Sequence, residues 1–194
     1  MKLGLIGCGR MGKALAVGAI DAGAVAASEV MAYDLYPAAL KGLVSERGVT
    51  PAGSVAEVAA AVDVLLLCTK PYDVSGALQE IAGSGSSKES LLVISVAAGT
   101  TVEKLEREVA DGARVIRSMP NTPALIGKGA AAFTRGSGAT EEDSRTASSP
   151  LGPVGLGVEA TQSLIDAATR LQRSGPASSP VCTAAPAHPE DDNP

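Results

Sequence analysis

Leu3-Gly4-Leu5-Ile6-Gly7-Cys8-Gly9-Arg10-Met11-Gly12 is the stretch that decides the fold. A short apolar run leads into three glycines spaced G-x-G-x-x-G, and a helical pattern from Lys13 to Ala22 follows directly. This order predicts a strand, a tight turn and a helix that bind a dinucleotide pyrophosphate. The first glycine would permit the turn, the second would let the backbone approach the pyrophosphate, and the third would let the helix pack closely. The alternative is a plain glycine-rich loop, against which the flanking strand and helix argue.

The next 120 residues or so alternate short apolar runs with helical patterns. Strands are predicted at 29–34, 49–50, 63–68, 91–97, 113–118 and 129–134, and helices at 37–47, 55–61, 72–82 and 101–109. Continuous apolar runs such as Val64 to Leu67 are typical of central parallel strands that are covered on both faces. The sequence therefore predicts an α/β fold, a Rossmann-like, doubly wound and mainly parallel sheet with helices on both faces.

Composition narrows the class of protein. The chain has 194 residues, of which 45% are apolar and 2% aromatic, so small aliphatic side chains must build the core. A formal charge of −5 without basic clusters argues against a nucleic-acid partner. Three widely spaced cysteines and one histidine indicate neither a disulfide framework nor a metal site, which favours a reducing, cytoplasmic setting. We expect no membrane span and no signal peptide, since no apolar run is long enough and glycines interrupt the first one.

Candidate ligand-binding residues lie at the predicted carboxyl ends of the strands, where open α/β sheets bind ligands. Asp34 follows Gly12 by 22 residues and ends the second strand, which is typical of a carboxylate that binds the adenosine ribose. A solvated turn acid before Pro37 is the alternative. Lys70 and Asn121 add polar groups at other strand ends, and they could equally be a surface lysine and a turn residue.

Four segments carry a family resemblance: Ile6–Gly12, Thr69–Pro71, Ser95–Thr100 and Arg117–Ala124. In this order and spacing they resemble pyrroline-5-carboxylate reductase over about residues 1–143. The resemblance implies NADPH- or NADH-dependent reduction of 1-pyrroline-5-carboxylate to L-proline, the last step of proline biosynthesis. It implies hydride transfer that depends on alignment, with no catalytic residue assigned. Asp34 would favour NADH, although Arg10, Lys41 or Arg47 could offset its charge.

The same resemblance implies a set of site residues. The cofactor would contact Ile6, Gly7, Cys8, Gly9, Arg10, Met11, Gly12, Asp34, Cys68, Thr69, Lys70, Pro71, Val96, Ala97, Ala98 and Asn121. The substrate would contact Met119, Pro120, Asn121, Ser174 and Gly175, the first three of them in a loop that closes the nicotinamide side.

The second half of the chain departs from the family pattern. We expect a dinucleotide-binding domain at 1–135, a remnant of a linker and helical dimerisation domain at 136–177, and a disordered Ser/Pro/Gly-rich tail at 178–194. Residues 144–150 break the helix expected after Asp143, which suggests a shifted reading frame, a faulty gene model or a decayed gene. The family homo-oligomerises through a helical half that also completes the substrate site. Because we expect this chain to lack most of that half, we expect weak or no imine reduction here. The alternatives are a β-hydroxyacid or prephenate-dehydrogenase-like reductase and a non-catalytic dinucleotide-binding module.

Overall fold

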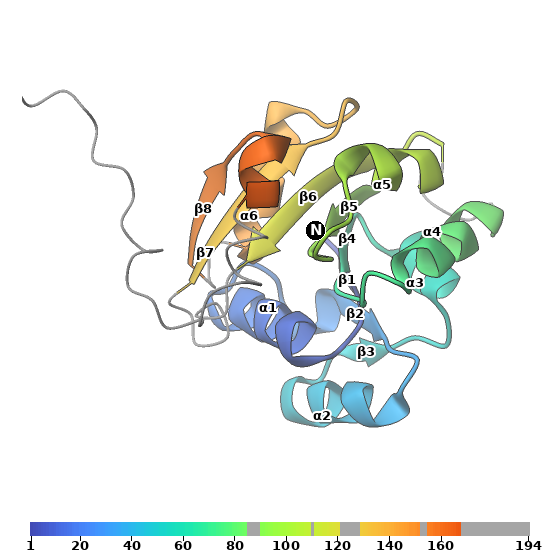
Figure 1. Cartoon of the computed structure of the whole chain (residues 1–194). Coiled ribbons are helices and arrows are strands. Elements are labelled where there is room, and N and C mark those ends of the chain that lie inside the picture. Colours follow the sequence, from blue (N-terminus) through green and yellow to red (C-terminus); the bar gives the residue numbers. More distant parts are fainter. Residues whose placement is uncertain (85–89, 110, 121–128, 152–154, 168–194) are drawn as a thin grey trace, which may run out of the picture.

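The computed structural model describes residues 1–84, 90–109, 111–120, 129–151 and 155–167 (Figure 1). Within these residues one sheet has the strand order β3-β2-β1-β4-β5-β6-β7-β8. The strands are β1 (Leu3–Ile6), β2 (Val30–Tyr33), β3 (Thr50–Pro51), β4 (Val64–Leu67), β5 (Leu92–Ser95), β6 (Arg114–Pro120), β7 (Gly129–Arg135) and β8 (Gly155–Glu159). The helices are α1 (Arg10–Asp21), η1 (Ala27–Glu29), α2 (Pro37–Arg47), α3 (Val55–Ala61), α4 (Val74–Gly83), α5 (Val102–Glu108) and α6 (Glu141–Leu151), and residues 162–167 are also helical.

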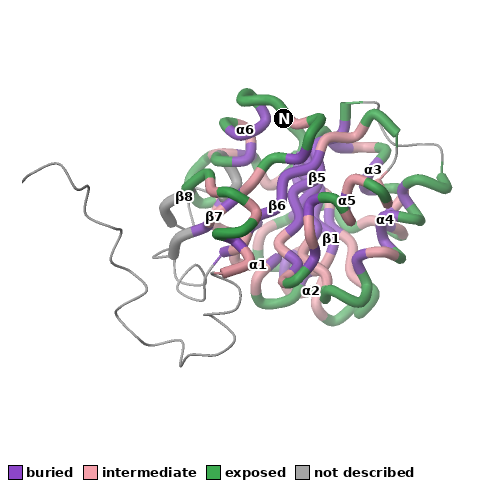
Figure 2. Tube along the Cα trace, turned by 45° about the horizontal axis from the view of Figure 1, so that its top comes forward, coloured by how far each residue is buried: buried purple, intermediate pink, exposed green. Residues whose placement is uncertain are grey.

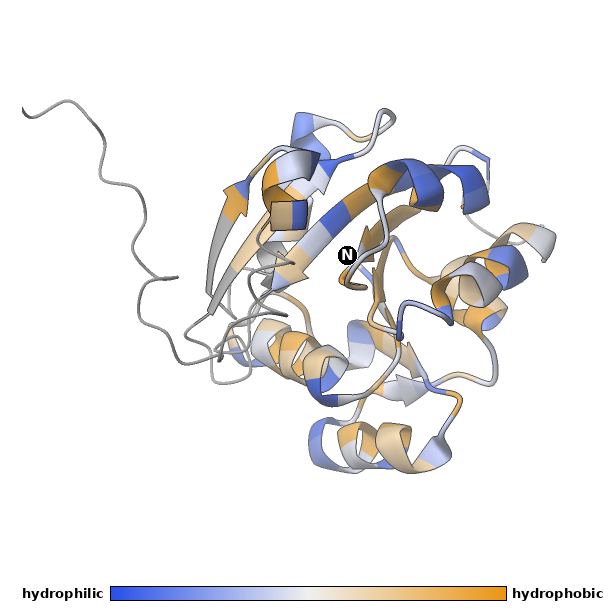
Figure 3. Ribbon diagram, viewed as in Figure 1, coloured by the Kyte–Doolittle hydropathy of each residue, from blue (hydrophilic) through white to orange (hydrophobic). Residues whose placement is uncertain are grey.

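Helices cover both faces of this sheet. On one face α1, α2 and α6 pack over Leu5, Leu66 and Ile94. On the other face α3, α4 and α5 pack over Leu65, Leu67 and Val93. The central strands are buried and apolar, while the outer helix surfaces are exposed (Figures 2 and 3). All strand pairs are parallel except β6 with β7, so the predicted mainly parallel, doubly wound sheet is confirmed.

Local sequence signals set several helix ends. The Ser54 hydroxyl accepts a hydrogen bond from the Glu57 N–H at 3.1 Å, which caps α3 as predicted. The Glu57 carboxylate reaches back to the Gly53 N–H at 2.7 Å, one residue earlier than in an ordinary capping box. Pro37 begins α2, and Gly48 ends it in the left-handed region with a φ of 72°.

The sixth strand is longer than predicted. It runs through Met119 and Pro120, which pair antiparallel with Ala132 and Ala131 of β7, so these two residues are not in a loop. A proline is compatible with this position because β6 pairs with β5 only as far as Arg117. Met119 and Pro120 nevertheless remain at the carboxyl end of their strand.

The interpretation of residues 144–150 as a break in a helix is wrong, because α6 spans Glu141–Leu151. Thr140 and Asp143 cap it reciprocally: the Asp143 carboxylate accepts from the Thr140 N–H at 2.7 Å, and the Thr140 hydroxyl accepts from the Asp143 N–H at 3.2 Å. Asp143 also forms an ion pair with Arg114 of β6 at 2.7 Å, and Ala147 is buried in the core beside α1. Tertiary contacts thus hold a helix that carries few apolar residues of its own.

The sheet continues past residue 135 through β8 at its edge. Arg117 of β6 is fully buried, and its guanidinium forms an ion pair with Asp166 at 2.7 Å, which joins the helical residues 162–167 to the sheet. The predicted domain boundary at 135 stays a prediction, and the predicted tail at 178–194 lies outside the described residues.

Candidate dinucleotide-binding site

The site is at the carboxyl ends of β1 and β4, where the sheet order changes direction. The chain leaves β1 toward β2 on one side and leaves β4 toward β5 on the other. The two strands stay paired up to this edge, since the Cys68 N–H donates to the Ile6 carbonyl at 2.7 Å. On the other side the Gly7 N–H donates to the Tyr33 carbonyl at 2.9 Å. This is the place in a doubly wound sheet where ligands bind.

A glycine is present at each of the three positions of this turn for a different physical reason. Gly7 has a φ of 92°, and a Cβ there would lie 2.8 Å from the Cys68 backbone carbonyl. A Cβ on Gly12 would lie only 2.0 Å from the Gly7 carbonyl oxygen, so the start of α1 can approach the turn only without a side chain. Packing inside the protein therefore explains both positions.

Gly9 is the exception. Its φ of −66° and ψ of −172° suit any residue, and a Cβ built there meets no protein atom within 4 Å. No contact within the described chain requires a glycine at this exposed position, although glycine is among the residues that commonly precede a helix. A group outside the protein that approaches the backbone closely would account for it, which fits a pyrophosphate.

The first turn of α1 is arranged to receive an anion. Gly9 precedes the helix and offers no side-chain cap, and no acidic residue lies in the first turn. The Lys13 N–H donates to the Gly9 carbonyl at 2.8 Å, so the N–H groups of the three residues before it point out of the helix end. These N–H groups and the helix dipole favour a phosphate.

Asp34 joins the second strand to the glycine turn. One carboxylate oxygen accepts from the Cys8 N–H at 2.6 Å, and the other accepts from the Tyr36 N–H at 2.7 Å. Asp34 is thus both a turn acid and a neighbour of the candidate pyrophosphate site, and the two interpretations offered by the sequence are compatible.

Cys8 lies in the glycine turn and Cys68 lies beside it, and both thiols are unreactive at neutral pH. Burial, and secondarily the Asp34 charge, raises the pKa of Cys8 to about 12. Burial, with Cys8 as a second cause, raises the pKa of Cys68 still further. Both thiols are therefore protonated at neutral pH and are poor nucleophiles.

The remaining candidates spread along the same edge. Thr69, Lys70 and Pro71 follow β4, and the Thr69 hydroxyl is buried without a hydrogen-bond partner in the described part of the chain. A buried donor of this kind is typical of a site that is completed by a ligand. Val96, Ala97 and Ala98 follow β5, with Ala97 buried. Asn121, Ser174 and Gly175 lie outside the described residues.

Sequence reasoning missed two aromatic residues at this edge. Tyr36 and Tyr72 follow the ends of β2 and β4, and their exposed fractions are 72% and 81%. The available signal was their rarity, because the chain has only three tyrosines, one phenylalanine and no tryptophan.

Other features of the described residues do not compete with this site. A shallow hollow lined by Met1, Ala24, Glu142, Arg145 and Thr146 lies at the opposite edge, near the amino end of β1. No group of three or more potential metal ligands occurs among the residues described. None of the helices in that part of the chain has the length and apolar character needed to cross a membrane.

Comparison with known proteins agrees with this geometry. Residues 2–99 match the family described as NADP oxidoreductase coenzyme F420-dependent. Pyrroline-5-carboxylate reductase of Methanosarcina acetivorans is 38% identical over 176 residues, which cover 91% of this chain and 64% of that protein. The chain thus spans less than two thirds of the length of this relative.

Solved structures give the same picture. A pyrroline-5-carboxylate reductase from Coxiella burnetii matches with a TM-score of 0.82 and 26% identity, over 91% of this chain and 65% of that one. A Plasmodium falciparum pyrroline carboxylate reductase with NADP bound matches with a TM-score of 0.77 and 26% identity, over 91% of this chain and 64% of that one.

Proposed function

Because the chain belongs to the NADP oxidoreductase family described as coenzyme F420-dependent, in its pyrroline-5-carboxylate reductase branch, we propose that it uses a reduced nicotinamide dinucleotide to convert 1-pyrroline-5-carboxylate into L-proline. The observation that carries this proposal is the glycine turn. It combines two glycines required by packing with one, Gly9, whose surroundings leave open space for a bound group. The substrate in this proposal is inferred from the relatives named pyrroline-5-carboxylate reductase.

The residues of this chain would hold the cofactor in a fixed orientation. Gly9 and the N–H groups at the start of α1 would bind the pyrophosphate, and Asp34 would bind the adenosine ribose. The Thr69 hydroxyl, buried beside the turn, would donate to the cofactor and exclude water there. We place Cys68, Lys70 and Pro71, together with Val96 to Ala98, along the nicotinamide half.

Hydride transfer to the imine would require little from the protein beyond this alignment of cofactor and substrate. A reduced nicotinamide supplies the hydride when bound, and an imine carbon is already electrophilic. Both described cysteines keep their protons at neutral pH, so neither acts as a base. We therefore assign the rate enhancement mainly to positioning, with Met119 and Pro120 at the end of β6 beside the imine. Asn121, Ser174 and Gly175 stay predicted substrate contacts.

The test separates binding from turnover. Calorimetric titration of the purified 194-residue chain with NADH and NADPH measures cofactor binding, and loss of nicotinamide absorbance with the imine measures reduction. Binding together with imine-dependent oxidation of the cofactor supports the proposal. Turnover with a β-hydroxyacid or with prephenate instead would support the rival reductases, and binding without any turnover would support the non-catalytic module.

Two further properties are part of this proposal. We propose that the protein acts in the cytoplasm on a small molecule and without a nucleic-acid partner. The mass of the species in solution, measured beside the activity assay, tests the predicted link between homo-oligomerisation and imine reduction.

A further inference from the structure

The carboxylate of Asp34 is held in one position. It is half-buried, and each of its oxygens accepts one backbone N–H, from Cys8 at 2.6 Å and from Tyr36 at 2.7 Å. The two donors belong to different segments, the glycine turn after β1 and the loop after β2. The carboxylate therefore cannot swing away from a bound ligand without giving up both hydrogen bonds.

The remaining acceptor positions of this carboxylate suit hydrogen-bond donors such as hydroxyl groups. An ionised carboxylate has about four acceptor positions, and the two backbone donors occupy two of them. The ribose 2′- and 3′-hydroxyls of NADH would donate to the other two. A 2′-phosphate near pH 7 is largely doubly charged and offers acceptors, so it would meet the fixed negative charge of Asp34 without a hydrogen bond in return.

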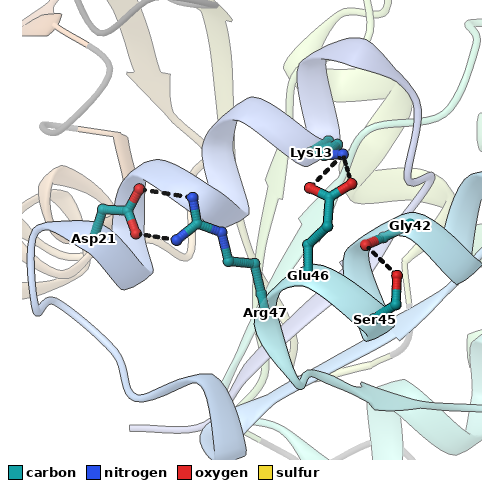
Figure 4. A network of polar contacts seen from close by, with 6 residues as sticks. All are labelled: Lys13, Asp21, Gly42, Ser45, Glu46 and Arg47. Atoms are coloured by element: carbon teal, nitrogen blue, oxygen red, sulfur yellow. Dashed lines mark hydrogen bonds and ion pairs between the residues drawn. The ribbon is translucent and has the colours of Figure 1, made fainter.

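Two of the cations on α1 and α2 are already paired with other carboxylates. Arg47 donates to both carboxylate oxygens of Asp21, at 2.6 and 3.1 Å, and Lys13 pairs with Glu46 at 2.9 Å (Figure 4). These pairs tie α1 to α2 and engage both cations with carboxylates other than Asp34. Arg10 is exposed at the start of α1, beside the proposed pyrophosphate site, where it would contact a group that both dinucleotides carry. Lys41 is exposed one turn inside α2.

From these contacts we propose that this chain selects NADH over NADPH, with Asp34 as the residue that determines the choice. The proposal rests on the proposed cofactor site and goes beyond it by naming which dinucleotide the site prefers. The proposed preference for NADH differs from the cofactor in the similar Plasmodium falciparum structure, which has NADP bound.

The experiment is calorimetric titration of the full chain with NADH and with NADPH at fixed ionic strength. We expect NADH to bind at least about tenfold more tightly, a ratio that corresponds to about 1.4 kcal/mol. Asp34→Asn and Asp34→Ser should both narrow this ratio, by weakening NADH and strengthening NADPH. Far-ultraviolet circular dichroism checks that each variant is folded, and the wild-type ratio tests the proposal even if neither is.

Asp63→Asn is the matched control, because the Asp63 carboxylate also accepts a backbone N–H, from Lys2 at 2.8 Å, but at the amino end of the sheet. It should leave the ratio unchanged. Lys41→Ala should also leave it unchanged, and a loss of NADPH binding in this variant would show that Lys41 offsets the charge of Asp34. Equal or tighter binding of NADPH by the wild-type chain overturns the selectivity and leaves the proposed function standing. Failure to bind either cofactor overturns the proposed function itself.

Discussion

Alanine substitutions at Gly9 and Gly12 should separate the part of the glycine turn that packs from the part that binds. The two glycines lie three residues apart in one motif, yet their surroundings differ. An added methyl group at Gly12 would lie 2.0 Å from the Gly7 carbonyl oxygen, whereas one at Gly9 would meet no protein atom within 4 Å. Gly9→Ala should therefore leave the fold nearly intact and weaken the cofactor complex, and Gly12→Ala should destabilise the fold itself.

The size of each effect follows from these distances. Carbon and carbonyl oxygen normally approach to about 3.3 Å, so the backbone around Gly12 must shift by roughly 1.3 Å. Overpacking against backbone costs about 3 kcal/mol at the upper end of the usual range. Gly9 precedes α1, where alanine is a poorer residue than glycine by up to about 1 kcal/mol. In binding, loss of one charge-assisted hydrogen bond to a phosphate is worth about 1.5–3 kcal/mol, or roughly 10- to 100-fold in the dissociation constant.

Urea unfolding followed by circular dichroism gives the stability of each variant, and calorimetric titration with NADH gives its affinity. Gly83→Ala is a matched control, because the methyl group also meets no atom within 4 Å but lies at the last residue of α4. It should change neither the affinity nor, by more than about 1 kcal/mol, the stability. Wild-type affinity in Gly9→Ala would refute the argument that this glycine makes room for a ligand. Equal destabilisation by Gly9→Ala and Gly12→Ala would refute the assignment of separate roles.

Three further predictions concern stability. Ser54→Ala removes the acceptor for the Glu57 N–H at the start of α3 and should cost about 1 kcal/mol of unfolding free energy in urea. Asp143→Ala should cost more, about 2–3 kcal/mol, because it removes the carboxylate that accepts from the Thr140 N–H at the start of α6 and leaves Arg114 without its buried partner; an effect as small as that of Ser54→Ala would contradict this account. Cys8 keeps its proton in the native state up to about pH 12, whereas the unfolded chain loses it near the ordinary value of 9.0. Stability should therefore fall between these pH values by up to about 1.4 kcal/mol per pH unit, and comparison of denaturation in wild type and Cys8→Ala should show a shallower fall in the variant.

The parts of the fold that the sequence predicted correctly are those with a local cause. The buried runs at β1, β4 and β5 are continuous and apolar, and Pro37, Ser54 and Thr101 begin helices by their own chemistry. The helix after the glycine turn begins at Arg10, three residues before the apolar periodicity starts, because the turn itself supplies the first helical residues. Periodicity reports which face of a helix is buried, and it says little about where the first turn begins.

The parts that were missed depend on partners distant in the sequence. Residues 141–151 lack an apolar stripe, and α6 is held by the ion pair of Asp143 with Arg114 and by burial of Ala147 beside α1. The Thr140–Asp143 cap was a readable signal for its first turn. The extension of β6 through Pro120 had no such signal, because it depends on pairing with Ala131 and Ala132 of β7.

Asp34 illustrates how the structure sharpens a residue that the sequence had already singled out. From sequence, the acid at the end of β2 was either a turn residue or a ribose ligand, and three cations were equally available to offset it. The contacts give it the turn role through Tyr36 and, through Cys8, a fixed place beside the glycine turn. They also engage Arg47 with Asp21, so both terminal nitrogens of this guanidinium already donate to a carboxylate. A carboxylate fixed in this way favours hydroxyl donors over a dianion, so the proposed preference for NADH follows from hydrogen bonds that the protein makes before a cofactor binds.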